Sequence, residues 1–191
     1  MKKIILFIAL LIPFPLAACN GEYQEAENQE KNQGIEEPRN KLENAEEIVT
    51  YLIQMIENIS DTKVYNEEND PNELLGRPGG YISKVDFIDS RVEERFINNI
   101  NSQDEILNEL VKEEMRTDFK VDYGGSVELF DNKEDAKNRY EYISTAAKES
   151  GGAKTEYGYL HENVYLRLSK SLTPTEAEEY EKKLIMFIES H

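Results

Sequence analysis

The sequence is poor in the residue types that most often carry catalysis or bind metal ions. Its 191 residues include one cysteine, two histidines and no tryptophan. A single cysteine excludes a disulfide within the chain, a CxxC redox motif and a thiolate zinc site. His161 falls in a predicted turn and His191 is the last residue, and the common catalytic motifs G-x-S-x-G, P-loop, H-E-x-x-H and G-x-G-x-x-G are missing. These absences predict a protein that is not an enzyme and has no catalytic residue, metal site or cofactor.

Positive charge is also scarce in this chain. Twenty-two Lys and Arg residues stand against 39 Asp and Glu residues, which gives a formal net charge of −17. Affinity for nucleic acid depends on Lys and Arg that neutralise phosphates, so we expect no nucleic-acid partner. Anionic lipid surfaces repel such a chain as well. We interpret the acidity as a solvated surface, and attraction to a cationic partner is the alternative.

The N-terminus has the features of a bacterial lipoprotein signal. Two lysines precede an apolar run from Ile4 to Ile12, which is too short to cross a bilayer as a mature helix. Residues 16–19, LAAC, resemble a lipobox, in which Cys19 receives a diacylglyceryl group through its sulfur and becomes the first mature residue. We therefore expect a signal peptide over residues 1–18 and a lipid anchor at Cys19 that holds the chain to the extracytoplasmic face of the cell membrane. The alternative is an ordinary signal peptide, or an anchor with an incidental cysteine.

Composition divides the rest of the sequence into two regions. Residues 19–43 are poor in apolar residues and rich in Glu, Gln and Asn, which is typical of a disordered acidic tether. At roughly 5–6 Å times the square root of its length, such a tether reaches on the order of 25–30 Å. Residues 44–191 are long enough to form one domain with its own core.

Side chains that cap helices mark several helix starts within residues 44–191. Each precedes apolar residues at helical spacing, and a cap accepts hydrogen bonds from the first free backbone amides of its helix. The predicted caps are Asn44, Ser102, Asp131 or Asn132, and Thr173, the last with Pro174 in the first turn.

Strand patterns alternate with these helices. Residues 81–88, YISKVDFI, alternate with Tyr81, Ser83, Val85 and Phe87 on one face. Several connections between the predicted strands are too short for parallel crossovers. The sequence therefore predicts an α+β domain, in which an antiparallel sheet of about five strands carries helices mainly on one face.

The stretch NDPNELLGRPGGY, residues 69–81, has a structural and a functional interpretation. In the structural one, Asp70 and Pro71 begin a one-turn helix that Gly76 ends, and residues 77–80 form a type II turn. In the functional one, Arg77 binds a carboxylate or phosphate. Oxygen atoms of residues 67–70 are a further alternative as calcium ligands, although their spacing does not match a calcium-binding loop.

Tyrosines cluster where the sequence TEYGYLHENVYLRLS predicts a hairpin. A three-residue loop, 161–163, would place Leu160 opposite Val164 in the core. The same register places four side chains together on the outer face: Tyr157, Tyr159, Tyr165 and Arg167. Tyrosine and arginine are enriched at protein interfaces, so these four residues, with Arg77, are the candidate binding residues. The alternative is that a helix covers the tyrosines as part of the core.

Three segments of the chain resemble small lipoproteins of Gram-positive bacteria. They are NDPNELLGRPGGY with SKVDF, then VELFDNKEDAKNR, then VYLRLSKSLTPTEAEEYEKKL. The resemblance covers most of residues 44–190 and is weakest over residues 91–120. It implies a location and an architecture and supplies no catalytic residue. We therefore expect a membrane-anchored, non-enzymatic binding module whose partner is a surface protein or a cell-envelope component. The alternatives are a cell-envelope hydrolase with carboxylate catalysis and a surface exclusion or immunity lipoprotein.

Overall fold

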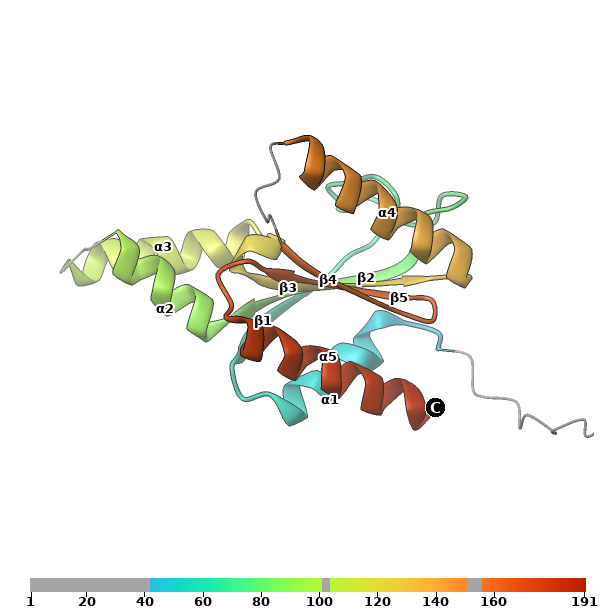
Figure 1. The fold of residues 1–191 in the computed structure, drawn as a ribbon. Helices are drawn as coiled ribbons and strands as arrows, with labels where there is room; N and C mark the ends of the chain where they lie inside the picture. Colours follow the sequence, from blue (N-terminus) through green and yellow to red (C-terminus); the bar gives the residue numbers. More distant parts are fainter. Residues whose placement is uncertain (1–41, 101–103, 151–155) are drawn as a thin grey trace, which may run out of the picture. The chain divides into compact units, whose positions relative to one another are not determined.

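Helices and strands alternate around one antiparallel sheet in the computed structural model, which describes residues 42–100, 104–150 and 156–191 (Figure 1). The sheet has five strands in the order β1-β2-β3-β5-β4, and every neighbouring pair is antiparallel. This confirms the predicted α+β class and strand number. The elements in chain order are α1 (Ala45–Met55), β1 (Ile59–Val64), β2 (Tyr81–Asp89), α2 (Ser90–Asn99), α3 (Glu105–Thr117), a 3-10 turn η1 (Val121–Tyr123), β3 (Gly124–Phe130), α4 (Lys133–Glu149), β4 (Glu156–His161), β5 (Val164–Ser169) and α5 (Pro174–Glu189).

Helices lie on both faces of the sheet, with the larger layer on one of them. Figure 1 shows α1 and α5 together on one side and α4 on the other, while α2 and α3 extend beyond the end of the sheet. The main apolar core lies between the sheet and the α1–α5 pair, where residues such as Leu52, Phe87 and Leu184 are fully buried. A smaller cluster lies under α4, around Tyr81, Phe130, Ala136 and Tyr165.

The helix caps follow the sequence closely. Asn44 accepts a hydrogen bond from the backbone N–H of Glu47, and Asn132 rather than Asp131 caps α4. Thr173 and the residue three positions later form a complete capping box, with proline in the first turn, as predicted. The predicted cap Ser102 lies outside the described residues, and Asp104 caps α3.

The segment between β1 and β2 folds as a series of turns, so the predicted one-turn helix is wrong. Glu73 adopts a left-handed φ of 53°, which interrupts helical backbone at the place where the helix would run. The Asp70 carboxylate instead accepts hydrogen bonds from the backbone N–H groups of residues 72, 74 and 75. The predicted turn over residues 77–80 is confirmed, because the N–H of Gly80 donates to the oxygen of Arg77 and Gly79 has a φ of 77°.

Strand β2 contains an irregularity that moves Tyr81 to the other face of the sheet. The pairing with β3 shifts between Tyr81 and Ser83. Val85 and Phe87 therefore pack in the core under α1 and α5, whereas Tyr81 packs under α4. The predicted common face for Tyr81, Val85 and Phe87 is wrong, because an extra residue in a strand reverses the direction of the side chains beyond it.

The β4–β5 hairpin has a two-residue loop, not the predicted three-residue loop. His161 pairs with Val164, and Glu162 in the loop has a φ of 54°. Asn163 forms two hydrogen bonds with Phe130 at the end of β3. Its side-chain amide donates to the backbone oxygen of Phe130, and its backbone oxygen accepts from the Phe130 N–H. These bonds fix the hairpin tip and therefore its register.

The N-terminal predictions fall mostly outside the described residues. The signal peptide, Cys19 and the tether up to residue 41 are not part of the described structure. Leu42, which we assigned to the tether, is 9 % exposed and packs in the main core, so the folded domain includes residues 42 and 43. None of the helices in the described part of the chain has the length and apolar character needed to span a bilayer.

Candidate functional site

Charged side chains are buried on the face of the sheet that α4 covers. Lys84 and Asp86 come from β2 and Glu128 from β3, and Arg167 of β5, which is 13 % exposed, lies beside them. The antiparallel register places Lys84 opposite Glu128, and Ser126 opposite both Asp86 and Arg167 on its two neighbouring strands. Residues opposite one another share a face, so these charges form two adjacent rows across the three central strands.

Glu128, in the first row, forms ion pairs with two arginines. It is fully buried and accepts hydrogen bonds from Arg139 of α4 at 3.0 and 3.3 Å and from Arg167 at 3.0 Å. Arg167 also donates two hydrogen bonds to Glu156 of β4, at 2.8 and 2.7 Å. Burial alone would lower the pKa of the Arg167 guanidinium, but the carboxylates of Glu156 and Glu128 raise it well above its usual value.

Lys84 is the second buried cation of this face. Its ammonium lies 3.5 Å from an oxygen of Asp86 and 3.7 Å from an oxygen of Asp70, and its side chain is 3 % exposed. It also lies 4.1 Å from the centre of the Tyr65 ring, which favours a cation–π contact. Both ion-pair distances exceed the usual 2.7–3.2 Å of a nitrogen–oxygen hydrogen bond, so these carboxylates do not saturate the ammonium.

Two buried oxygen atoms in the second row make no hydrogen bond of ordinary geometry among the described residues. They are Oδ1 of Asp86 and Oγ of Ser126. Burial raises the pKa of the Asp86 carboxyl, and the Lys84 charge and the neighbouring hydroxyls of Ser126 and Tyr65 oppose this shift without reversing it. An unsatisfied buried polar group costs about 1–3 kcal/mol, so native structures seldom keep one without a use.

A polar cavity of about 310 Å³ opens beside Asp86. Its walls come from the loop before β2, from β2 itself, from the η1 region and from β4 and β5. The lining residues are Pro71, Asn72, Lys84, Asp86, Phe119, Lys120, Val121, Asp122, Glu156 and Arg167. A side hollow of about 530 Å³ shares Asn72 and Arg167 with the polar cavity and adds Leu74, Tyr142 and Ile143. Walls from several elements that converge on a few charged groups are typical of small-molecule sites.

The five predicted binding residues do not form one surface. Tyr159 pairs with Leu166 and Tyr157 pairs with Leu168, so both tyrosines lie on the α1–α5 face. Tyr165 and Arg167 lie on the α4 face, where Tyr165 is 1 % exposed. The predicted four-residue outer face is therefore wrong, because a shift of one residue in register moves a strand's side chains to the opposite face.

Arg77 lies apart from the other four predicted residues, on the surface of the turn-rich loop. Its side chain is 63 % exposed and pairs with Glu73 at 3.3 Å. The hollow beside it, about 400 Å³, is lined mainly by acidic residues, including Glu67 and Glu68. Asp70, one of the considered calcium ligands, bonds to backbone amides and to the Tyr81 hydroxyl. Among the described residues no group of His, Cys, Asp and Glu is arranged to hold a metal ion.

Sequence reasoning missed Lys84, Asp86, Glu128, Arg139 and Glu156. The signal was present, because β2 carries charges of both signs at alternate positions, and β3, β4 and β5 each carry one charged residue of the cluster. Buried charges are nearly always paired, so opposite charges on neighbouring strands indicate a covered polar face. Their partners are up to 39 residues away in the chain, however, and pairing them requires the strand order.

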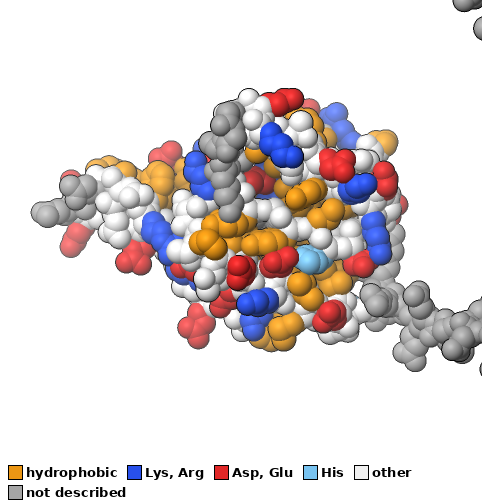
Figure 2. All heavy atoms as spheres, in the orientation of Figure 1, with side chains coloured by type: hydrophobic (Ala, Val, Ile, Leu, Met, Phe, Trp, Pro, Cys, Tyr) orange, Lys and Arg blue, Asp and Glu red, His pale blue; other side chains and the backbone are white. Residues whose placement is uncertain are grey.

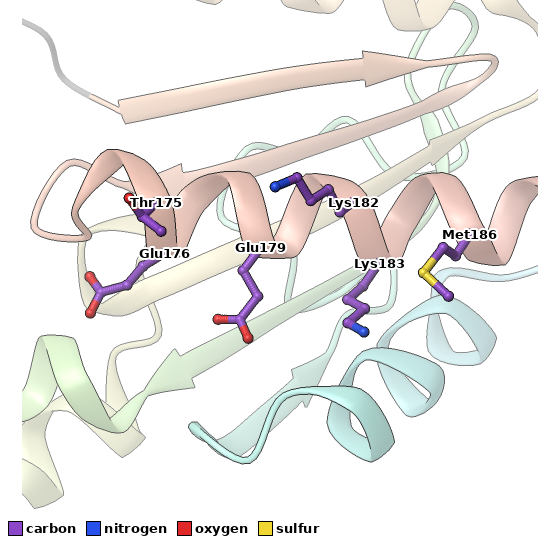
Figure 3. Close-up of a pocket in the computed structure, with 6 residues that line it drawn as sticks. All are labelled: Thr175, Glu176, Glu179, Lys182, Lys183 and Met186. Carbon is purple, nitrogen blue, oxygen red and sulfur yellow. The ribbon is translucent and has the colours of Figure 1, made fainter.

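A groove along α5 is a weaker candidate site (Figure 3). Its volume is about 430 Å³, and its lining residues are Thr175, Glu176, Glu179, Lys182, Lys183 and Met186. All six come from one helix, so no second element converges on a ligand there.

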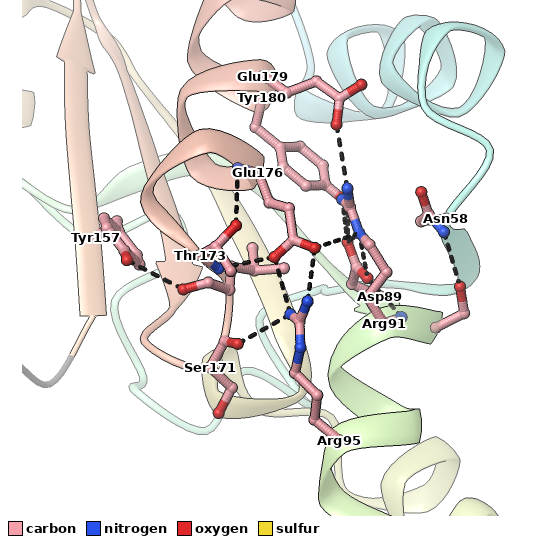
Figure 4. Close-up of polar contacts among 12 residues, drawn as sticks. Asn58, Asp89, Arg91, Arg95, Tyr157, Ser171, Thr173, Glu176, Glu179 and Tyr180 are labelled. Atoms are coloured by element: carbon pink, nitrogen blue, oxygen red, sulfur yellow. Dashed lines mark hydrogen bonds and ion pairs between the residues drawn. The ribbon is translucent and has the colours of Figure 1, made fainter.

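The polar network beside this groove joins α2 to α5 (Figure 4). The Tyr180 hydroxyl donates to buried Asp89 at 2.7 Å, Arg91 pairs with the same carboxylate at 2.7 Å, and Arg95 binds Glu176 through two hydrogen bonds. Every one of these groups has a protein partner, which favours a structural role. His161 likewise pairs with an α5 carboxylate at 3.0 Å.

On the face drawn in Figure 2, acidic and basic side chains of the described residues are interspersed, without a large region of one sign. Ligand recognition by charge is therefore best supported inside the polar cavity. No protein-family model, curated protein or solved structure matches the chain, so the resemblance to Gram-positive lipoproteins stays a prediction.

Proposed function

We propose that the chain is an extracytoplasmic binding module, held at the cell membrane by a lipid on Cys19, with the polar cavity as its ligand site. The observation that carries the ligand site is the buried Oδ1 of Asp86, which makes no hydrogen bond of ordinary geometry among the described residues and belongs to a residue that lines an open cavity. The anchor rests on the lipobox-like residues 16–19. A surface protein or a cell-envelope component is the proposed source of the ligand.

The energetics support binding over a purely structural role for the cluster. Replacing a buried ion pair by well-packed apolar residues is often neutral or stabilising, so a fold gains little from charges it could omit. Here the sheet buries Lys84, Asp86 and Glu128 at 3 % exposure or less. A ligand that donates a hydrogen bond to the Asp86 carboxylate would offset part of the desolvation cost of that group.

The anchor is tested by expressing the full chain in a bacterium that processes lipoproteins. The unchanged chain should sediment with membranes and yield an N-terminal Cys19 that carries a diacylglyceryl group in mass spectrometry. Cys19→Ala should move the protein to the soluble fraction or leave its leader attached, and Asn20→Ala is the matched control that should change nothing. An unmodified thiol on a chain that keeps residues 1–18 would refute the anchor.

A cell-envelope hydrolase is the second candidate, and one observation favours it. Burial raises the pKa of the Asp86 carboxyl, and a raised pKa is what a general acid needs. Glu156 supplies a second carboxylate to the same cavity. If the chain hydrolyses wall glycan or peptide, Asp86→Asn should lower the rate at least 100-fold while Glu179→Gln on α5 should not. If the unchanged chain releases product no faster than Asp86→Asn does, this candidate is rejected.

A surface exclusion or immunity role is a further proposal for the same anchored module. In this role, the partner is a component of an incoming DNA-transfer apparatus, or a toxin. Cells that lack the chain should then lose protection against that agent, and cells that carry Cys19→Ala should lose it too. Equal sensitivity of all three strains would reject the role.

A further inference from the structure

The charges that line the polar cavity are balanced. Three cations, Lys84, Lys120 and Arg167, stand with three carboxylates, Asp86, Asp122 and Glu156. A simple anion or cation in this cavity meets as many like charges as opposite ones. A molecule that carries both signs can pair each end with its complement, so the lining favours a zwitterion.

The acceptors for a positive end lie at Asp86. Its Oδ1 is buried and makes no hydrogen bond of ordinary geometry in the described part of the chain, and Asp86 lines the cavity, whereas Ser126 does not. An ammonium group carries three donors and no acceptor, so it can donate to this carboxylate. A carboxylate or phosphate cannot bond to Oδ1 of an ionised Asp86, because both groups would be acceptors.

The donors for a negative end lie at Arg167 and Lys84. A guanidinium has five N–H donors, and only three are used by Glu128 and Glu156 among the described residues. Lys84 lies 3.5 Å and 3.7 Å from its carboxylate partners, which leaves its ammonium able to bond to a further oxygen. Asp86 and Arg167 are two strands apart, about 10 Å between Cα atoms, and their side chains leave a short span between them.

The side hollow supplies an apolar surface next to this polar pair. It shares Asn72 and Arg167 with the polar cavity, and Leu74, Tyr142 and Ile143 lie on its walls. Tyr142 is 67 % exposed there, so a ligand substituent would cover apolar surface that is now open to solvent. The polar cavity itself is at the lower end of the volume range of ligand sites.

We propose that the polar cavity binds a free α-amino acid with an apolar side chain. Asp86 receives its ammonium group, Arg167 and Lys84 receive its carboxylate, and the side hollow takes its side chain. This rests on the proposed binding function and specifies the ligand class.

Calorimetric titration of the detergent-solubilised full chain tests the inference with three matched probes. These are L-phenylalanine, phenethylamine, which lacks the carboxylate, and 3-phenylpropionate, which lacks the ammonium. Phenylalanine should bind at least 10-fold more tightly than either half-probe. Asp86→Asn should weaken phenylalanine at least 10-fold, and Glu179→Gln in the α5 groove should leave it unchanged. Because Asp86 is buried and its variant could unfold, Tyr142→Ala is the second variant: it should weaken phenylalanine about 3–10-fold and leave glycine unchanged.

The outcomes separate the ligand class from the function. A half-probe, or a neutral sugar, that binds the same cavity as tightly as phenylalanine overturns the amino-acid inference and keeps the binding module. Phenylalanine binding that Asp86→Asn and Tyr142→Ala both leave unchanged overturns the assigned site. Absence of binding by all of these probes at millimolar concentration overturns both the inference and the cavity as a ligand site.

Discussion

Replacing Glu128 by methionine removes the buried charge that holds Arg139 and Arg167. The Glu128 side chain is fully buried, and the side chains of Arg139 and Arg167 are 10 % and 13 % exposed. Arg167 keeps its pair with Glu156, whereas Arg139 has no other carboxylate partner among the described residues. The substitution therefore leaves one guanidinium buried without compensation.

Removal of one partner from a buried ion pair costs about 3–5 kcal/mol. We expect the lower end, about 3 kcal/mol, because Arg139 lies near the surface and can move its head group into water. A domain of about 150 residues loses about 2–4 °C of melting temperature per kcal/mol. The melting temperature should therefore fall by about 6–12 °C.

Urea unfolding followed by circular dichroism measures this loss directly. The double variant with Arg139→Met should recover at least half of it, because an apolar pair can replace a buried ion pair at little cost. Glu141→Gln, on the exposed side of α4, is the matched control and should change stability by less than about 0.5 kcal/mol. A single variant within about 1 kcal/mol of the unchanged chain, or a double variant no more stable than the single one, would refute the reasoning.

Three further predictions concern other parts of the domain. Tyr180→Phe removes the 2.7 Å hydrogen bond to buried Asp89 and should cost about 1–2 kcal/mol in urea unfolding; no change would mean that the bond is replaced by water. Gly125→Ala would place a methyl group 2.7 Å from a backbone oxygen of β5, so the variant should lose about 1–3 kcal/mol, and an unchanged unfolding midpoint would contradict the close approach. The Arg95 guanidinium lowers the pKa of Glu176 from 4.5 to about 2, so its contribution is full above about pH 4.5 and is lost as the pH falls towards 2. With Glu176→Gln, the unfolding free energy lost between about pH 4.5 and pH 2 should be smaller by about 1–2 kcal/mol, allowing for solvent screening. Identical losses in both proteins would show that the pair does not stabilise the fold.

Local chemistry predicted the element types well, because helix caps and turns depend on neighbouring residues. Thr173 forms its capping box from residues within one helical turn, and Pro78 with Gly79 forms the predicted turn. The strand number also follows from local alternation. These features need no information about distant partners.

The register errors have a different cause. The hairpin loop depends on Asn163 bonding to Phe130, which is 33 residues away, and on a glutamate in left-handed backbone, which sequence patterns seldom assign. The β2 irregularity likewise becomes visible only against its partner strand. Because side chains alternate with a period of two, the hairpin register places Tyr157 and Tyr159 on the opposite face from Tyr165, and the β2 irregularity moves Tyr81.

The candidate site was only partly accessible from the sequence. Arg167 was selected as a binding residue, but for an exposed face, whereas it lies in the polar cavity with Glu128 and Glu156. Asp86 was assigned to a strand without a role, because the buried surroundings of its Oδ1 appear only once Ser126 and Lys84 are positioned around it.

A crystal structure of the full chain grown with L-phenylalanine tests the role of the polar cavity most directly. We expect the ligand's ammonium nitrogen within hydrogen-bond distance of Asp86 Oδ1, its carboxylate against Arg167, and its ring beside Tyr142. A cavity that holds the same ordered water molecules with and without the amino acid, with those waters bonded to Asp86 and Ser126, would contradict it.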